Sequence, residues 1–276
     1  MGTGATLNPD RQLANRARRR KGRLWRVARE TLPAWVFIAL IAAWWAAVAI
    51  LKVPSFLLPP PQDVLPRIWE GRQSLFNHSM ITIQEILLGF GLSVVTAIPL
   101  GLLIALSPVA KRMLYPLLVF IQLVPKIAIA PLFVVWMGFG LTSKVMLTLL
   151  LTFFPLLLAS IAGFQILDQR LLYLTRSMGA TTWQTFRYLR FPAALPVIFG
   201  GLKTSATIAA TAAIVAEFVG SNNGLGYVLL QGTANLDTTL VFAVLFLLTI
   251  IGLALNSIVE VVEYLMTPWQ RSHGKA

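Results

Sequence analysis

Four charged residues lie inside otherwise apolar stretches of this sequence, and they are the first candidates for chemistry. They are Glu85, Lys126, Lys203 and Glu217. A charge in membrane hydrocarbon is costly, so such a residue is by default a functional candidate. The two acids are expected near the outer membrane surface, where they can meet water. Lys203 can extend its aliphatic stem to the inner surface.

Lys126 is the candidate that is hardest to explain as structure, because it lies between Pro125 and Pro131. Two prolines remove two backbone donors and break a helix. Broken helices at membrane depth are tolerated where they line a cavity or are buried in protein. We therefore expect Lys126 to contact a solute pathway or an anionic solute, with a structural ion pair or snorkelling as the alternative. Glu217 is the second pathway candidate.

The sequence offers no set of residues for a metal site, a catalytic site or a nucleotide-binding site. It has no cysteine, and its two histidines, His78 and His273, lie far apart in the sequence. The sequence therefore predicts no metal site, no catalytic residues and no cofactor bound by the chain itself. It also lacks the GxxxxGK[ST] loop that cradles nucleotide phosphates.

The second candidate region is the polar connection at residues 167–196. Gly179 can adopt the positive φ that ends one short helix, and Thr181 with Gln184 forms a capping-box pair that starts another. Pro192 is expected to end this second helix, and Pro196 to begin a membrane helix. The second helix presents an aromatic and cationic face, which predicts a partner surface or, alternatively, a helix lying on lipid. That face consists of Trp183, Phe186, Arg187 and Arg190.

The elements that position these residues are membrane helices. The chain is 57% hydrophobic and 12% charged, whereas soluble domains are about 25% charged. A bilayer core needs about 20 apolar residues per helix, and the sequence predicts an all-α, polytopic membrane helix bundle with six transmembrane helices. These are Pro33–Leu51, Ile81–Leu106, Met113–Phe139, Lys144–Ile166, Val197–Val219 and Thr239–Ile258. Small residues in the second and fifth predict close packing inside the bundle.

The basic residues set the expected orientation. The net charge is +13, and basic residues concentrate before the first apolar segment and in every second connection. Such an excess marks the cytoplasmic side, so both termini are expected there. This distribution is explained by topology and requires no nucleic acid. Four regions follow: a basic cytoplasmic tail at 1–30, a peripheral helix and outer loop at 31–77, a five-helix core at 78–266 and a cytoplasmic tail at 267–276.

The 167–196 connection resembles the cytoplasmic EAA loop of binding-protein-dependent ABC transporter permeases. Gly179 matches the glycine of that motif and Leu195-Pro196 its closing pair, while Tyr173-Leu174-Thr175 stands where the acidic start would be. Further phrases across residues 78–266 resemble the nitrate, sulfonate and taurine branch. They are Gly89-Phe90-Gly91, Ile98-Pro99-Leu100-Gly101, Ala130-Pro131-Leu132, Trp136 to Gly140, Phe191 to Pro196, and Ala216-Glu217 through Gly224-Leu225-Gly226.

This resemblance implies an inner-membrane importer permease that works as two copies, with two cytoplasmic ATPases and an external solute-binding protein. ATP and magnesium would bind to the ATPase, and alternating access would move a small solute, such as a sulfonate, taurine, nitrate or a carboxylate. The resemblance places ATPase docking at Gly179, Ala180, Thr181, Trp183, Gln184, Phe186, Arg187 and Pro192.

Two other classes remain as alternatives. An ATP-independent secondary carrier or channel would need intramembrane acids for ion coupling, and only Glu85 and Glu217 qualify. A membrane-embedded enzyme would need a cluster of catalytic side chains, which the sequence does not offer.

Overall fold

A computed structural model describes residue 32 and residues 35–269. The expected 1–30 tail and the last residues of the 267–276 tail lie outside the described residues. The chain divides into two compact units, and the boundary along the sequence falls between Leu65 and Pro66. Each unit is described by itself.

The first unit contains the apolar helix Trp35–Leu51 and the beginning of α2, Pro61–Glu70. Within this unit, Trp45 Nε1 donates a hydrogen bond of 2.8 Å to Gln62 Oε1. Helix α2 begins at a proline, Pro61. A proline is well tolerated at the first position of a helix, where its missing N–H would have no partner.

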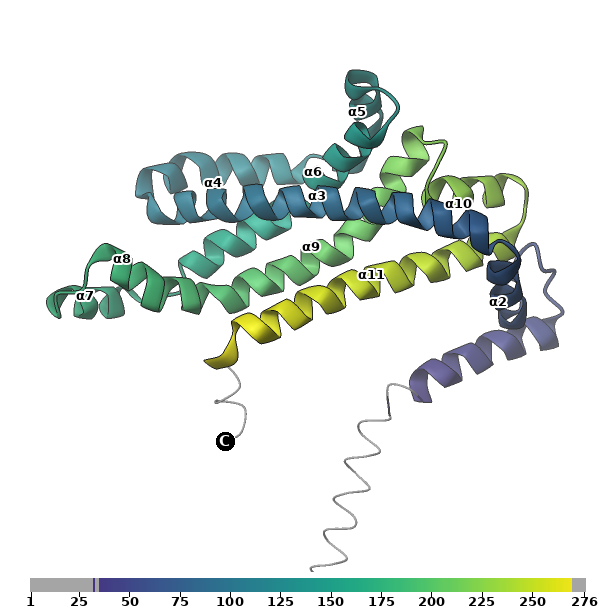
Figure 1. Ribbon diagram of the computed structural model, residues 1–276, viewed down its shortest axis with the longest axis horizontal. Coiled ribbons are helices and arrows are strands. Elements are labelled where there is room, and N and C mark those ends of the chain that lie inside the picture. The colour runs from purple at the N-terminus through teal and green to yellow at the C-terminus, as the bar shows by residue number, and fades with distance from the viewer. Residues whose placement is uncertain (1–31, 33–34, 270–276) are drawn as a thin grey trace, which may run out of the picture. The chain divides into compact units, whose positions relative to one another are not determined.

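The second unit is a bundle of long helices joined by shorter helical segments (Figure 1). They are α3 (Arg72–Leu106), α4 (Pro108–Leu123), η1 (Lys126–Ile129), α5 (Ala130–Met137), α6 (Leu141–Phe164), α7 (Gln169–Ser177), α8 (Thr182–Thr185), η2 (Phe186–Arg190), α9 (Phe191–Gly220), α10 (Leu225–Ala234) and α11 (Thr238–Met266). The all-α prediction is confirmed.

The described residues contain four helices long and apolar enough to cross a membrane, or up to five if a bent pair is counted as one span. Trp35–Leu51 is a shorter apolar helix. The predicted third segment, Met113–Phe139, is the bent pair: α4 and the η1–α5 piece meet at 77°. The expected break near Pro125 is therefore confirmed, and α5 projects from the bundle in Figure 1 while its first turn packs on α6 and α9.

Helices α3 and α6 pack along a seam that repeats every four residues. Positions on one face of a helix recur at this spacing. A Cβ atom at Gly89 would lie 2.6 Å from Thr148, and one at Gly101 only 2.5 Å from Ser160 Cβ. The same spacing extends to two side-chain contacts, the Glu85–Lys144 ion pair four residues before Gly89 and the Ser93–Thr152 hydrogen bond four residues after it. Small and polar residues thus let the two backbones approach closely.

Helix α9 lies at the centre of the bundle and packs on α6, α3 and α11. Its alanines are buried, as predicted for a helix that packs through small residues. They are Ala206, Ala209, Ala210, Ala212, Ala213 and Ala216. Figure 1 shows α8 at one end of α9 and α10 beside the other end.

Candidate functional site

The segment between α6 and α9 folds locally as its sequence predicts. Asp168 caps α7 by accepting the Arg170 N–H at 2.9 Å. Gly179 then ends this turn with a φ of +79°, a conformation in which a side chain causes strain. The Ala180 N–H bonds back to the Thr175 carbonyl at 3.1 Å. The chain therefore reverses at Gly179.

The capping box that starts α8 is present in both directions. The Gln184 N–H donates to Thr181 Oγ1 at 3.2 Å, and the Thr181 N–H donates to Gln184 Oε1 at 2.8 Å. Two backbone donors at the helix start are thereby satisfied. This part of the prediction is confirmed.

Pro192 does not end the short helix, which corrects the sequence prediction. Residues Thr182–Gly220 form one continuous helical segment of 39 residues, with Pro192 and Pro196 inside α9. The π-helical turn η2 precedes Pro192, and the Phe191 N–H reaches back to the Phe186 carbonyl. This π-helical turn shifts the backbone hydrogen-bond register by one residue. The helix can therefore continue through Pro192, which has no N–H to donate, without breaking a hydrogen bond that the turn already forms.

The aromatic and cationic residues of this segment divide into two groups. Trp183 is 65% exposed, while Phe186 is half-buried and stacks on Trp183 at 5.7 Å between ring centroids. Phe186 also stacks on Phe164 of α6 at 6.4 Å. Phe186 therefore fastens the segment to the bundle, and Trp183 presents the outward surface.

A hollow of about 640 Å³ lies beside this stack. Its lining includes Leu102, Arg176, Trp183, Phe186 and Arg190. Arg187 and Gln184 are exposed, and Ala180, Arg190 and Pro192 are half-buried. Within the described residues, Arg176, Arg187 and Arg190 form no ion pair. The segment thus offers unpaired positive charge beside an exposed indole ring.

Lys126 lies at the bend between α4 and α5. Its Nζ donates to the Gln122 carbonyl at 2.8 Å and lies 4.8 Å from the ring centroid of Phe154. Among the described residues no carboxylate pairs with it. The structural ion pair that was the alternative interpretation is therefore not formed among the described residues, and the ammonium is held by a carbonyl and an aromatic face.

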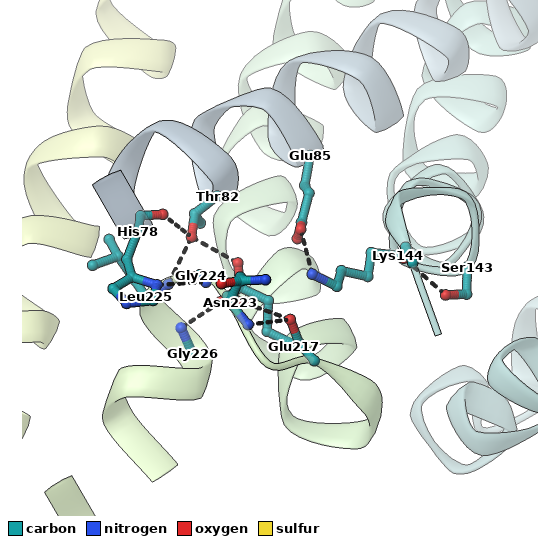
Figure 2. Close-up of polar contacts among 12 residues, drawn as sticks. His78, Thr82, Glu85, Ser143, Lys144, Glu217, Asn223, Gly224, Leu225 and Gly226 are labelled. Carbon is teal, nitrogen blue, oxygen red and sulfur yellow. Dashed lines mark hydrogen bonds and ion pairs between the residues drawn. The ribbon is translucent and has the colours of Figure 1, made fainter. Parts of the chain in front are cut away.

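Glu217 is fully buried, contrary to the expectation that it meets water near the outer surface. Its Oε1 accepts the Thr82 hydroxyl at 2.6 Å, and its Oε2 accepts the Gly226 N–H. The Thr82 oxygen in turn accepts the Leu225 N–H at 2.8 Å. Figure 2 shows these groups gathered around the turn that precedes α10.

The glycines of this turn are explained by Glu217. Gly224 has a φ of +103°, and a Cβ atom there would lie 2.0 Å from Glu217 Oε1. A Cβ at Gly226 would lie 2.7 Å from Oε2. The Gly224 N–H donates to His78 Nδ1 at 3.0 Å. The turn thus folds back over the carboxylate and shields it from water.

Glu85 is the other acid expected near water, and it is also fully buried. Its Oε1 pairs with Lys144 Nζ at 2.7 Å. Lys144, the first residue of the predicted segment Lys144–Ile166, has a side chain only 8% exposed. The expectation that the acids meet water rested on their position within each apolar segment. In the structure, the packing of α3, α6 and α9 against one another buries Glu85, Lys144 and Glu217.

The last intramembrane charge also has a partner. Lys203 Nζ lies 2.5 Å from Glu263 Oε2 on α11, so it forms an ion pair and its position does not depend on snorkelling alone. Sequence reasoning missed Thr82 and Lys144 as members of a polar cluster. The only signal would have been the spacing of three residues from Ser79 to Thr82 and of four residues from Lys144 to Thr148, and both spacings are common on any helix.

The structure does not bring the two pathway candidates together. Lys126 contacts Gln122 and Phe154, whereas Glu217 contacts Thr82 and the α10 turn. Glu217 has both oxygens occupied inside the protein. Of the two, Lys126 is only half-buried, so a solute can reach its ammonium more readily than the fully buried carboxylate of Glu217.

The sequence matches the family described as binding-protein-dependent transport system inner membrane component over residues 97–272. It is 36% identical over 235 residues to the riboflavin transport system permease protein RibX of Chloroflexus aurantiacus, covering 84% of this chain and 88% of that protein. It is 30% identical over 267 residues to the taurine transport system permease protein TauC of Escherichia coli, covering 94% and 96%.

The fold is similar to that of a solved transporter structure. An inward-facing structure of the MetNI methionine ABC transporter matches with a TM-score of 0.56 and 20% sequence identity. The match covers 71% of this chain and 98% of that chain. At this identity the similarity concerns the fold alone.

Proposed function

This chain belongs to the family of binding-protein-dependent transport system inner membrane components, and from that premise we propose how it is energised and what it carries. It is a membrane permease subunit of an ABC importer. In our proposal two copies assemble with two cytoplasmic ATPases and an external binding protein. ATP and magnesium bind to the ATPases, and both termini of this chain lie in the cytoplasm.

We place ATPase docking on the residues from Gly179 to Pro192, which we call the coupling segment. The observation that carries this proposal is an exposed Trp183 beside arginines that have no acidic partner among the described residues. Aromatic and arginine side chains are enriched at the centres of protein interfaces. Since Tyr173-Leu174-Thr175 replaces the acidic start of the family motif, the Gly179–Arg187 part supplies the contact.

Transmission follows from the continuity of the helix that begins in this segment. Thr182–Gly220 is one helical segment, and Phe186 stacks on both Trp183 and Phe164. A displacement of α8 is therefore passed along α9 to the cluster around Glu217. ATP-driven approach of the two ATPases would move the paired segments and open the permease toward the binding protein.

The solute we propose is a small organic or inorganic anion, such as a sulfonate, taurine, nitrate or a carboxylate. The support is Lys126, whose ammonium lies at the break in a membrane span without a carboxylate partner among the described residues. Glu217 is not part of this proposal, because both its oxygens accept hydrogen bonds inside the protein. The relatives named above belong to a riboflavin and a taurine transport system. Because these solutes differ in chemistry, the proposed solute class needs a direct test.

The test reconstitutes the permease with its ATPase and binding protein in lipid vesicles. We expect solute-dependent ATP hydrolysis and uptake in the wild type, and a loss of ATPase association with Trp183→Ala. The matched control is Trp69→Ala, because Trp69 is 70% exposed but lies in α2. Normal ATPase association and uptake in Trp183→Ala would refute the docking proposal. Uptake without any ATPase would instead support a secondary carrier.

A further inference from the structure

Two carboxyl groups and one ammonium group are enclosed together at one end of the bundle. Glu85 comes from α3, Lys144 from α6 and Glu217 from α9 (Figure 2). Both glutamates are fully buried and the Lys144 side chain is 8% exposed. These three residues are called the buried triad.

The hydrogen-bond donors around the triad are distributed unequally. Glu217 receives one donor on each oxygen, from the Thr82 hydroxyl and the Gly226 N–H. Glu85 receives only the Lys144 ammonium, on Oε1. Its other oxygen, Oε2, is buried and accepts no hydrogen bond from any described residue.

The charges of the triad do not balance if both acids are ionised. Two carboxylates and one ammonium leave one negative charge inside the protein, where an uncompensated charge is far costlier than a neutral polar group. The charged side chains that act on Glu85 are Lys144 and Glu217. His78 offers no compensation toward the turn, since its Nδ1 accepts the Gly224 N–H. The turn before α10 contributes backbone N–H groups only.

We propose that Glu85 holds a proton on Oε2 and donates it toward the Glu217 carboxylate, so that the buried triad is electrically neutral. The bare oxygen then becomes a donor, and Glu217 gains a third hydrogen bond. Lys144 remains charged and Glu217 is its counterion, with the neutral Glu85 between them.

The donors decide which acid carries the proton. A carboxylate prefers the site with more hydrogen-bond donors, because each donor stabilises its negative charge. Glu217 has two neutral donors in addition to its interaction with Lys144. Glu85 has none on Oε2. We therefore assign the proton to Glu85. Its carboxyl group lies close enough to Glu217 for the two side chains to share a hydrogen bond.

This arrangement fastens three helices and the α10 turn at one place without burying net charge. The protonation proposal does not depend on the solute or on the partners proposed above. A result that refutes it therefore leaves the proposed solute and partners unaffected, and the reverse also holds. A glutamine at position 85 would mimic the protonated acid, since its carbonyl can accept from Lys144 and its amide can donate to Glu217.

Infrared spectroscopy of the full-length chain in lipid bilayers at pH 6 tests this proposal. The carbonyl stretch of a protonated carboxyl is resolved from the bands of carboxylates, and exposed acids are ionised at this pH. We expect one protonated carboxyl in the wild type and in Glu260→Gln, which changes an exposed acid. We expect none in Glu85→Gln or Glu217→Gln, and two in Lys144→Gln.

Thermal unfolding of the same variants locates the proton. We expect Glu85→Gln to keep nearly the wild-type midpoint and Glu217→Gln to lose more. A wild type without the band, or Glu85→Gln with it, overturns the proposal. If Glu217→Gln lowers the unfolding midpoint less than Glu85→Gln does, the assignment of the proton to Glu85 is wrong. Wild type and Glu85→Gln decide the first question even if Lys144→Gln does not fold.

Discussion

The α carbon of Gly224 faces the carboxylate of Glu217 so closely that a Cβ atom would lie 2.0 Å from Oε1. This contact explains why a glycine with a φ of +103° stands before α10. The turn closes over the acid, and the acid in turn bonds the Gly226 N–H. Backbone conformation and buried charge are therefore specified together.

Gly224→Ala should destabilise the protein. The added methyl group meets Glu217 and the residue must also hold a positive φ, so we expect a cost of about 2–5 kcal/mol. The measurement is the thermal unfolding midpoint of the purified chain. Gly91→Ala is the control, since a Cβ there meets nothing within 4 Å. A wild-type midpoint for Gly224→Ala would contradict the close contact.

Gly101→Ala should push α3 away from α6. Its Cβ would lie 2.5 Å from the Cβ of Ser160, so we expect a loss of about 1–3 kcal/mol. Ser160→Gly removes the opposing atom, and the double variant should recover part of the loss. Gly200→Ala, with open space at its Cβ, is the matched control. Purely additive losses would show that the two sites are not in contact.

Thr181→Val should loosen the start of α8. It removes the side chain that accepts the Gln184 N–H, a cap worth about 1 kcal/mol. We expect faster hydrogen exchange at residues 182–186 and weaker ATPase association, measured on the same preparation. Thr182→Val changes the neighbouring exposed threonine, which does not accept the Gln184 N–H, and should leave the exchange unchanged. Unaltered exchange in Thr181→Val would mean that the cap contributes nothing.

Asp237→Asn should make stability less dependent on acid pH. Burial tends to raise the pKa of Asp237, but the Leu240 N–H and Arg67 outweigh it and hold the pKa below its ordinary value. A lowered pKa gives stability that is fully present above the unfolded-state pKa and is lost as the pH falls through the lower folded-state pKa.

The Arg67–Asp237 pair measures 2.7 Å and is partly exposed, so its contribution is about 1 kcal/mol or less. Unfolding midpoints of wild type and Asp237→Asn should differ near neutral pH and converge in acid. Asp63→Asn, at an exposed position, should show no such convergence. A constant difference down to strongly acid pH would rule out this source of pH dependence.

The sequence alone determined the features that depend on neighbours a few residues away. Apolar segments indicated the membrane helices, Pro125 and Pro131 indicated the break in the third span, and Gly179 with Thr181 and Gln184 indicated the coupling turn. Each of these signals acts within one or two helical turns. They can therefore be recognised before any packing is known.

Tertiary structure decided the features that depend on distant partners. Glu217 and Thr82 are 135 residues apart, and Lys144 and Glu85 are 59 residues apart. Their burial arises only when α3, α6 and α9 pack together and the α10 turn closes over them. Pro192 was misjudged because the π-helical turn before it, and the stacking of Phe186 on Phe164, keep the helix continuous. Local sequence gives each side chain its charge and reach, whereas packing determines whether that charge meets water or a partner.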